Sequence, residues 1–102
     1  MKTNIKYLTP REIKPIVKSI CDEFLVTLEE LKEESNVDIK EAIAIICYYL
    51  YGLNGYSPSS LARYLGIKHS TVIYHSKKIK GQAEVNELYA KKLERILKQT
   101  KN

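Results

Sequence analysis

The chain has 102 residues, a formal net charge of +5 and a sequence pI near 9.2, and this length suits one domain with a core of its own. Its four glycines form no glycine-rich phosphate loop, which argues against an ATPase. No apolar export segment follows the first charges, and the apolar run 42–51 is shorter than the roughly 20 residues that span a membrane. We therefore expect a cytoplasmic protein without a membrane partner.

Cys21 and Cys47 lie too far apart in the sequence for a zinc pair, and each stands in an apolar helical pattern. We expect buried free thiols, which a reducing cytosol allows. No metal-ligand spacing, no Ser/His/Asp order and no paired carboxylates beside a histidine occur in the sequence. We therefore expect no metal, no cofactor and no enzymatic activity.

The charges are unevenly distributed along the chain. Residues 1–41 hold seven basic and nine acidic side chains, residues 42–83 hold five basic and no acidic ones, and residues 84–102 hold five basic and three acidic ones. A solvent-facing surface normally mixes both signs, so an acid-free basic stretch favours a polyanionic partner such as DNA.

Residues 1–8 predict an N-terminal arm, followed by one domain over residues 9–99 and a tail over 100–102. Thr9-Pro10-Arg11-Glu12 offers an N-cap, a proline at the first helical position and a capping-box glutamate. Apolar residues then keep helical spacing to about Phe24, and Pro15 inside the pattern predicts an irregular helix. The spaced residues are Ile13, Ile16 or Val17, Ile20 and Phe24.

Thr27-Leu28-Glu29-Glu30 repeats the capping box, so we expect a short helix from Leu28 to about Glu33 with Leu28 and Leu31 facing inward. The acidic residues around it indicate a solvated face. Repulsion of DNA and contact with a basic partner are the open alternatives.

A long apolar helix is predicted to open at Asp38-Ile39-Lys40-Glu41 and to end near Gly52 and Asn54-Gly55. Its apolar residues cover almost a full circle, which is typical of the central helix of a bundle; length and caps favour a helix over a buried strand. One face holds Ile39, Ala42 or Ile43, Ile46, Leu50 and Leu53, and Ile45, Tyr48, Tyr49 and Tyr51 widen it.

The stretch from Ser57 to Ile79 predicts a helix-turn-helix. Ser57 can cap a helix that starts at Pro58 and ends by Leu65, and Gly66 supplies the backbone freedom for a sharp turn. A second helix should run from about His69 to Ile79, with Gly81 ending it. The core between the two helices would hold Leu61, Leu65, Ile67 and Val72, with the small Ala62 allowing a close approach.

Helical spacing divides the second helix of this pair into two faces. Val72, Ser76 and Ile79 share the inward face, and Ile73 lies at its edge. The outward face carries hydrogen-bond donors, namely Ser70, Thr71, Tyr74, Lys77 and Lys78. The remaining tyrosines fit the core and its rim better than base stacking.

The run from Lys68 to Ile79 (KHSTVIYHSKKI) resembles the signature of the C-terminal DNA-binding domain of DnaA, the bacterial chromosomal replication initiator, where Arg-Asp-His-Thr-Thr-Val opens the recognition helix. From about Ile16 the order of predicted segments is also similar to that family. The resemblance implies an all-α, compact bundle of about six helices in the Trp-repressor-like helix-turn-helix class, from a bacterium or phage.

The resemblance also implies site residues. Its histidine and the residue after it correspond to His69 and Ser70, which would touch base edges together with Lys68 at the entry to the major groove. The expected phosphate contacts are Ser57, Ser59, Arg63, Thr71, Tyr74, Lys77 and Lys78. As alternatives, His69 fits a plain helix cap, and His75 fits a half-buried packing residue better than a DNA contact.

The chain departs from the family pattern at two places. Ile67-Lys68 stands where the family has Arg-Asp, and the loop 33–38 is acidic where the family has a basic loop with a minor-groove arginine. We therefore expect a target other than the family's origin sequence, read mainly through one major groove.

From Gln82 to about Gln99 another apolar stripe predicts a closing helix. Its members are Val85, Leu88, Tyr89, Leu93, Ile96 and Leu97. The stripe fits packing onto the domain, and a homodimer seam along this helix is the alternative.

Two functions follow as expectations. The favoured one is sequence-specific binding of double-stranded DNA by a stand-alone regulator or accessory replication factor without ATPase, including one carried by a mobile element. The alternative is a protein-protein interaction module that keeps the fold without specific DNA binding.

Overall fold

The structure is a computed structural model that describes residues 10–27, 29–32 and 37–100. Within these ranges the chain forms helices and no strands. The α-helices are α1 (Pro10–Glu23), α2 (Val37–Cys47), α3 (Pro58–Leu65), α4 (His69–Val85) and α5 (Glu87–Thr100). A 3-10 helix, η1 (Glu30–Lys32), precedes α2, and a π-helical segment, η2 (Tyr48–Leu53), continues it.

The all-α prediction is confirmed, but with five α-helices in the described part of the chain instead of about six. The short helix expected from Leu28 is the single 3-10 turn η1. Its capping box forms as predicted: the Thr27 N–H donates to Glu30 Oε1 at 2.8 Å, and the Glu30 N–H donates to Thr27 Oγ1 at 3.1 Å. Leu28 and Glu33, the two ends of the predicted helix, lie outside the described residues.

Helix α1 spans the predicted range, with Pro15 inside it. Ile13, Val17 and Ile20 are buried as their spacing predicts. The expected arm, the Thr9 cap and most of the acidic loop 33–38 lie outside the described residues.

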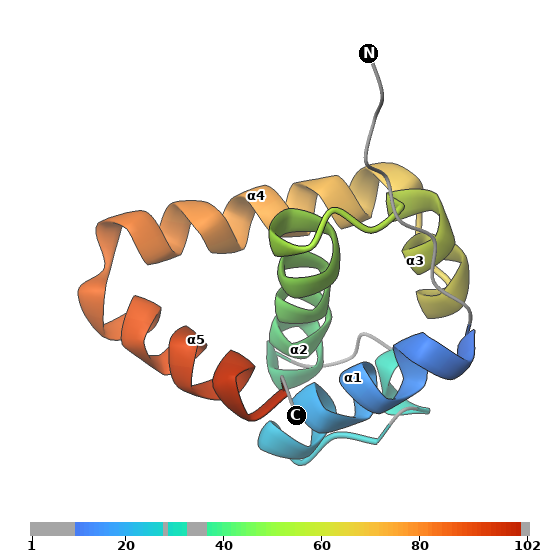
Figure 1. The fold of residues 1–102 in the computed structure, drawn as a ribbon, viewed down its shortest axis with the longest axis horizontal. Helices are drawn as coiled ribbons and strands as arrows, with labels where there is room; N and C mark the ends of the chain where they lie inside the picture. Colours follow the sequence, from blue (N-terminus) through green and yellow to red (C-terminus); the bar gives the residue numbers. More distant parts are fainter. Residues whose placement is uncertain (1–9, 28, 33–36, 101–102) are drawn as a thin grey trace.

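Helix α2 stands in the middle of the molecule, with α1, α4 and α5 arranged around it (Figure 1). Its side chains from Ala42 to Cys47 are all at most 5% exposed, which agrees with the prediction of a central helix. Its α-helical turns end at Cys47, and the backbone then widens into π-helical η2 before Asn54. The Asn54 side chain donates to the Tyr49 carbonyl at 2.6 Å and so satisfies a carbonyl at this end.

Helix α4 crosses η2 at a contact between two small residues. A Cβ atom on Gly52 would lie 2.5 Å from Ser76 Oγ and 3.3 Å from Tyr48 Cδ1, inside the 3.5–4.0 Å or so at which packed atoms attract. Ser76 is buried on the inward face of α4. Gly52 therefore lets the two helices approach closely.

Two predicted helix boundaries are wrong. Helix α4 does not end at Ile79 or Gly81 but runs on to Val85, and the closing helix starts at Glu87 instead of Gln82. Gly81 has no positive φ, so nothing in its conformation ends the helix. Asn86 separates the helices instead: its Oδ1 accepts from the Tyr89 N–H at 3.0 Å and caps α5.

Helix α5 packs back onto the molecule through Leu93, Ile96 and Leu97, as the first of the two interpretations of its stripe expects. Lys92 ties it to its neighbours, with Nζ 3.6 Å from Glu41 Oε2 and 5.7 Å from the centroid of the Phe24 ring. Burial, followed by the nearby Glu41 carboxylate, raises the pKa of Tyr89 to about 12.

The core runs through the whole described structure and contains both cysteines. Cys21 and Cys47 are buried free thiols, as predicted. Burial, with Asp22 adding to it for Cys21, raises the pKa of Cys21 to about 11, and burial alone raises the pKa of Cys47 to about 12. None of the helices described is long and apolar enough to cross a bilayer.

The close crossing at Gly52 and Ser76 predicts that Gly52→Ala changes the free energy of unfolding in opposite directions, depending on whether Ser76 is present. Gly52→Ala should destabilise the fold by about 1 kcal/mol, because overpacking of roughly 1–3 kcal/mol exceeds the helix-propensity gain of about 1 kcal/mol. In the Ser76→Ala background the clashing oxygen is gone, and the same change should stabilise the fold by up to about 1 kcal/mol. Urea unfolding of the parent, the two single variants and the double variant measures the four free energies of unfolding. If the effects of the two substitutions simply added, the close crossing would be contradicted.

Candidate nucleic-acid interface

Helix α3 begins and ends as the sequence predicts. The Ser57 side chain accepts from the Ser60 N–H at 3.3 Å, and Pro58 occupies the first turn. At the other end Gly66 adopts φ 74° and ψ 31°, and the Gly66 and Ile67 N–H groups both donate to the Ala62 carbonyl, at 2.8 and 3.0 Å. This left-handed cap turns the chain sharply into α4.

The side chains expected between α3 and α4 pack there. Leu61, Leu65 and Val72 are buried, and Ile67 in the turn is half-buried. Ala62 is 4% exposed, in agreement with a close approach of α4. The two helices therefore pack as one unit, and the solvent-exposed side of α4 forms most of its outer surface.

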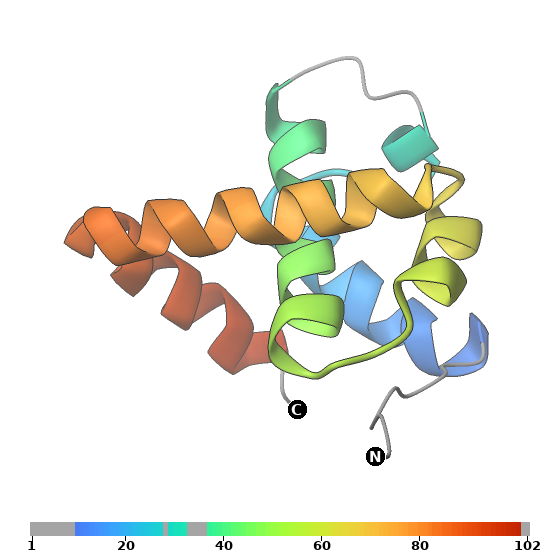
Figure 2. The same ribbon diagram turned by 90° about the horizontal axis from the view of Figure 1, so that it is seen from above.

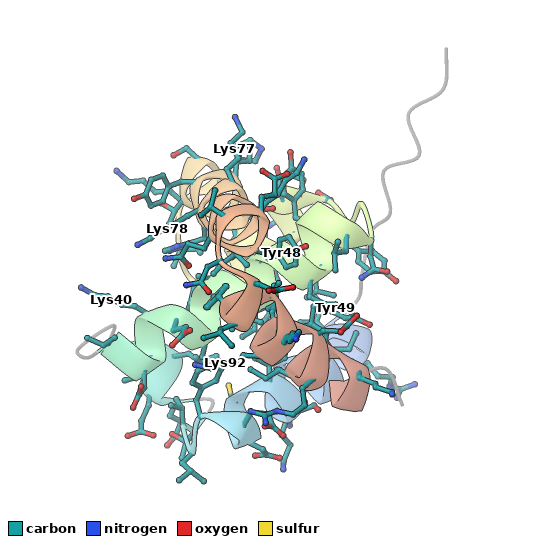
Figure 3. The ribbon with its side chains drawn as sticks, turned by 90° about the vertical axis from the view of Figure 1, so that its left-hand side faces the viewer. Lys40, Tyr48, Tyr49, Lys77, Lys78 and Lys92 are labelled. Atoms are coloured by element: carbon teal, nitrogen blue, oxygen red, sulfur yellow. The ribbon has the colours of Figure 1, made fainter. Side chains whose placement is uncertain are left out.

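The inward and outward faces of α4 are those predicted over its first three turns. Val72, Ser76 and Ile79 are buried and Ile73 is half-buried. Tyr74 is 60% exposed, and Lys77 and Lys78 are exposed. Figure 3 looks along α4 and shows Lys77 pointing away from α2 and Lys78 pointing sideways from α4.

The three expected base-contact residues gather at the N-terminal end of α4. Lys68, His69 and Ser70 are all exposed. Lys68 occupies the N-cap position with an extended backbone and makes no side-chain cap bond; its carbonyl accepts from the Thr71 and Val72 N–H groups at 3.0 and 3.3 Å. His69 is therefore not the cap of this helix, and its ring stands on the first turn facing solvent.

The expected phosphate-contact residues differ in accessibility. Ser59 and Arg63 on α3 are exposed, and Thr71 on α4 is partly exposed. Ser57 is 4% exposed and its oxygen accepts the capping hydrogen bond, so it offers no group to an outside partner. It stands apart from the rest of the predicted set.

His75 is half-buried, as the packing interpretation expects. Its ring centroid lies 5.7 Å from that of Tyr74 at an interplanar angle of 58°. Tilted aromatic pairs at this distance are favourable. Tyr74 therefore contacts His75 while most of its surface stays exposed to solvent.

The cations of this surface have no internal counter-charge. Throughout the described ranges, Arg63, Lys68, Lys77, Lys78 and Lys80 take part in no ion pair; those that do form are Lys18–Asp22 and Lys92–Glu41. An anion that approaches this surface meets unpaired positive charges.

Sequence reasoning missed Lys40. This lysine belongs to the acidic segment 1–41, but it is exposed on the first turns of α2. In Figure 3 Lys40 and Lys78 project toward the same side of the molecule. Only the three-dimensional arrangement reveals this, because the two residues are far apart in the sequence.

A comparison with models of known protein families finds no match for this chain, and a comparison with curated proteins also finds none. Among the side chains that the structure describes, no three His, Cys, Asp or Glu residues gather where they could hold a metal ion.

We expect the substitution of glycine by alanine to have opposite effects on stability at Gly66 and at Gly81. Gly66→Ala should cost about 1 kcal/mol or more, because Gly66 has φ 74°. Gly81→Ala should stabilise by about 1 kcal/mol, because no atom lies within 4 Å of an added Cβ and α4 continues through this position. Thermal unfolding measures both changes, and destabilisation by Gly81→Ala would mean that α4 breaks there.

Proposed function

We propose that this protein binds double-stranded DNA sequence-specifically, with α3 and α4 acting as a helix-turn-helix and α4 as the recognition helix. It would act as a stand-alone regulator or accessory replication factor, without ATPase or other enzymatic activity. The observation that carries the proposal is the outward surface of α3 and α4, where exposed donors and cations occur with no acidic residue between Ala42 and Ala83.

The proposal assigns sequence reading to the N-terminal end of α4. Lys68, His69 and Ser70 are exposed together where a recognition helix enters the major groove. A lysine at this position donates to the O6 and N7 acceptors of guanine, whereas the acidic residue of the DnaA-like pattern would accept from cytosine N4. The preferred base opposite Lys68 should therefore differ from that of the family it resembles.

Phosphate binding is assigned to exposed side chains of α3 and α4 near the N-terminal end of α4. Arg63 and Ser59 come from α3, and Thr71, Tyr74, Lys77 and Lys78 come from α4. Such contacts fix the orientation of a protein on the duplex and carry most of the salt dependence of binding. Ser57 is left out of the proposed interface because it is buried, and Lys40 joins it as a flanking cation.

A salt titration tests the electrostatic part. The triple variant Arg63→Ala/Lys77→Ala/Lys78→Ala should bind all duplexes more weakly, and the slope of log K against log salt should become shallower by about 0.9 for each phosphate that is no longer neutralised. Lys14→Ala is the control, because Lys14 is an exposed lysine on α1, outside the proposed interface. Fluorescence anisotropy at several salt concentrations measures both slopes.

An unchanged slope in the triple variant would contradict the proposed phosphate binding. If the parent protein bound no duplex at any salt concentration, the DNA-binding proposal would fail. The interaction-module alternative would then be favoured.

A binding selection on random duplexes tests base reading. The parent chain should enrich a short site containing a guanine that becomes cytosine in the Lys68→Asp variant, with discrimination of about 1–3 kcal/mol at that position. Ser59→Ala should weaken binding without changing the selected sequence, because it removes only a bond to phosphate. Identical selected sites for the parent and Lys68→Asp would show that position 68 does not read the site.

A further inference from the structure

The C-terminal half of α4 and the start of α5 form an arm that projects beyond α2. Figure 2 shows α4 extending past α2 before α5 folds back beneath it. The tip of the arm, residues 84–88, carries two apolar side chains in solvent, Val85 at 87% and Leu88 at 80% exposure. Glu84 and Glu87 flank them and are also exposed.

A groove lies on the inner side of the same arm. It has a volume of about 790 Å³ and lies between η2, the end of α4 and α5. Its apolar floor includes Tyr48, Tyr49, Leu53, Leu93 and Leu97. Figure 3 shows Tyr48 between α4 and α5, and Tyr49 beside α5.

The rim of the groove is basic. Lys91, Arg95 and Lys98 line it, against one carboxylate from Glu94. Nowhere in the described chain does one of these cations, or either glutamate of the tip, take part in an ion pair. The chain thus presents an acidic apolar tip and a groove whose lining carries an excess of basic side chains.

We propose that the tip of one copy docks into the groove of a second copy, and the second copy's tip into the groove of the first. Val85 and Leu88 would fill the apolar floor, and Glu84 and Glu87 would meet Lys91 and Arg95. The tip joins α4 to α5, and the groove lies beside it between η2, α5 and the end of α4. A two-fold axis between two copies would bring each tip to the other copy's groove and close the assembly at two copies.

The tip is already fixed in the shape that docking needs. The Asn86 N–H donates to the Gln82 carbonyl at 2.9 Å, and Asn86 Oδ1 caps α5 at 3.0 Å. The Lys92–Glu41 pair holds α5 in place. A preorganised tip loses little conformational entropy on association. This dimer is independent of the proposed DNA binding, because it uses none of the residues assigned to DNA.

Complementary charge reversal tests the pairing. The tip variant Glu84→Lys/Glu87→Lys and the groove variant Lys91→Glu/Arg95→Glu should each be monomeric, because like charges then face each other. An equimolar mixture should form a heterodimer, since each tip again meets a groove of opposite charge. Sedimentation velocity up to about 1 mM protein, the upper end of weak association, distinguishes these states, and circular dichroism confirms that each variant is folded.

The apolar part of the interface has its own matched pair of variants. Leu88→Ser should weaken dimerisation at least tenfold, whereas Val37→Ser should leave it unchanged, because Val37 is an equally solvent-exposed residue on α2, at 78% exposure. A parent chain that stays monomeric at about 1 mM would overturn the proposal and leave the groove to another acidic, apolar partner. A dimer that persists in both charge variants, or a mixture that stays monomeric, would also overturn it.

Discussion

The contact between Gly52 and Ser76 fixes where α4 lies. An added Cβ on Gly52 would lie 2.5 Å from Ser76 Oγ, so a larger residue at position 52 requires the Ser76 side chain or one of the two helices to shift. Helix α4 in turn carries the outward donors and cations, and its inner face closes the core over α2 and α3. The presentation of Lys77 and Lys78 to solvent thus depends on Ser76 on the inward face of α4 and on Gly52 in η2.

Local signals in the sequence predicted the parts of the fold that local chemistry controls. Ser57 caps α3, Gly66 makes the left-handed turn, and Thr27 and Glu30 form a reciprocal capping box. Each of these features depends on hydrogen bonds between residues three or four positions apart, so the residue types at those positions predict it. The two faces of α4 followed for the same reason, because helical spacing alone separates Val72 from Lys77.

The remaining features depend on contacts between distant segments. Gly81 is typical of a helix end, but helix α4 continues through it because a glycine in an exposed helix costs only about 1 kcal/mol and Asn86 offers a better break. The π-helical turns of η2 have no marker in the sequence. Including Lys40 in the candidate interface, and excluding Ser57, required knowledge of burial and of position in space. Most of the candidate interface was therefore predictable, but its edges were not.

Because α4 is one continuous helix, its length sets the distance between its two ends. Its 17 residues place the recognition end and the arm tip about 25 Å apart, at 1.5 Å per residue. If two copies dock tip to groove as proposed, α4 and not a flexible linker connects each recognition end to the dimer contact. Lengthening α4 by about seven residues, close to two turns, would move the recognition end outward by roughly 10 Å and rotate its outward face by only about 20°.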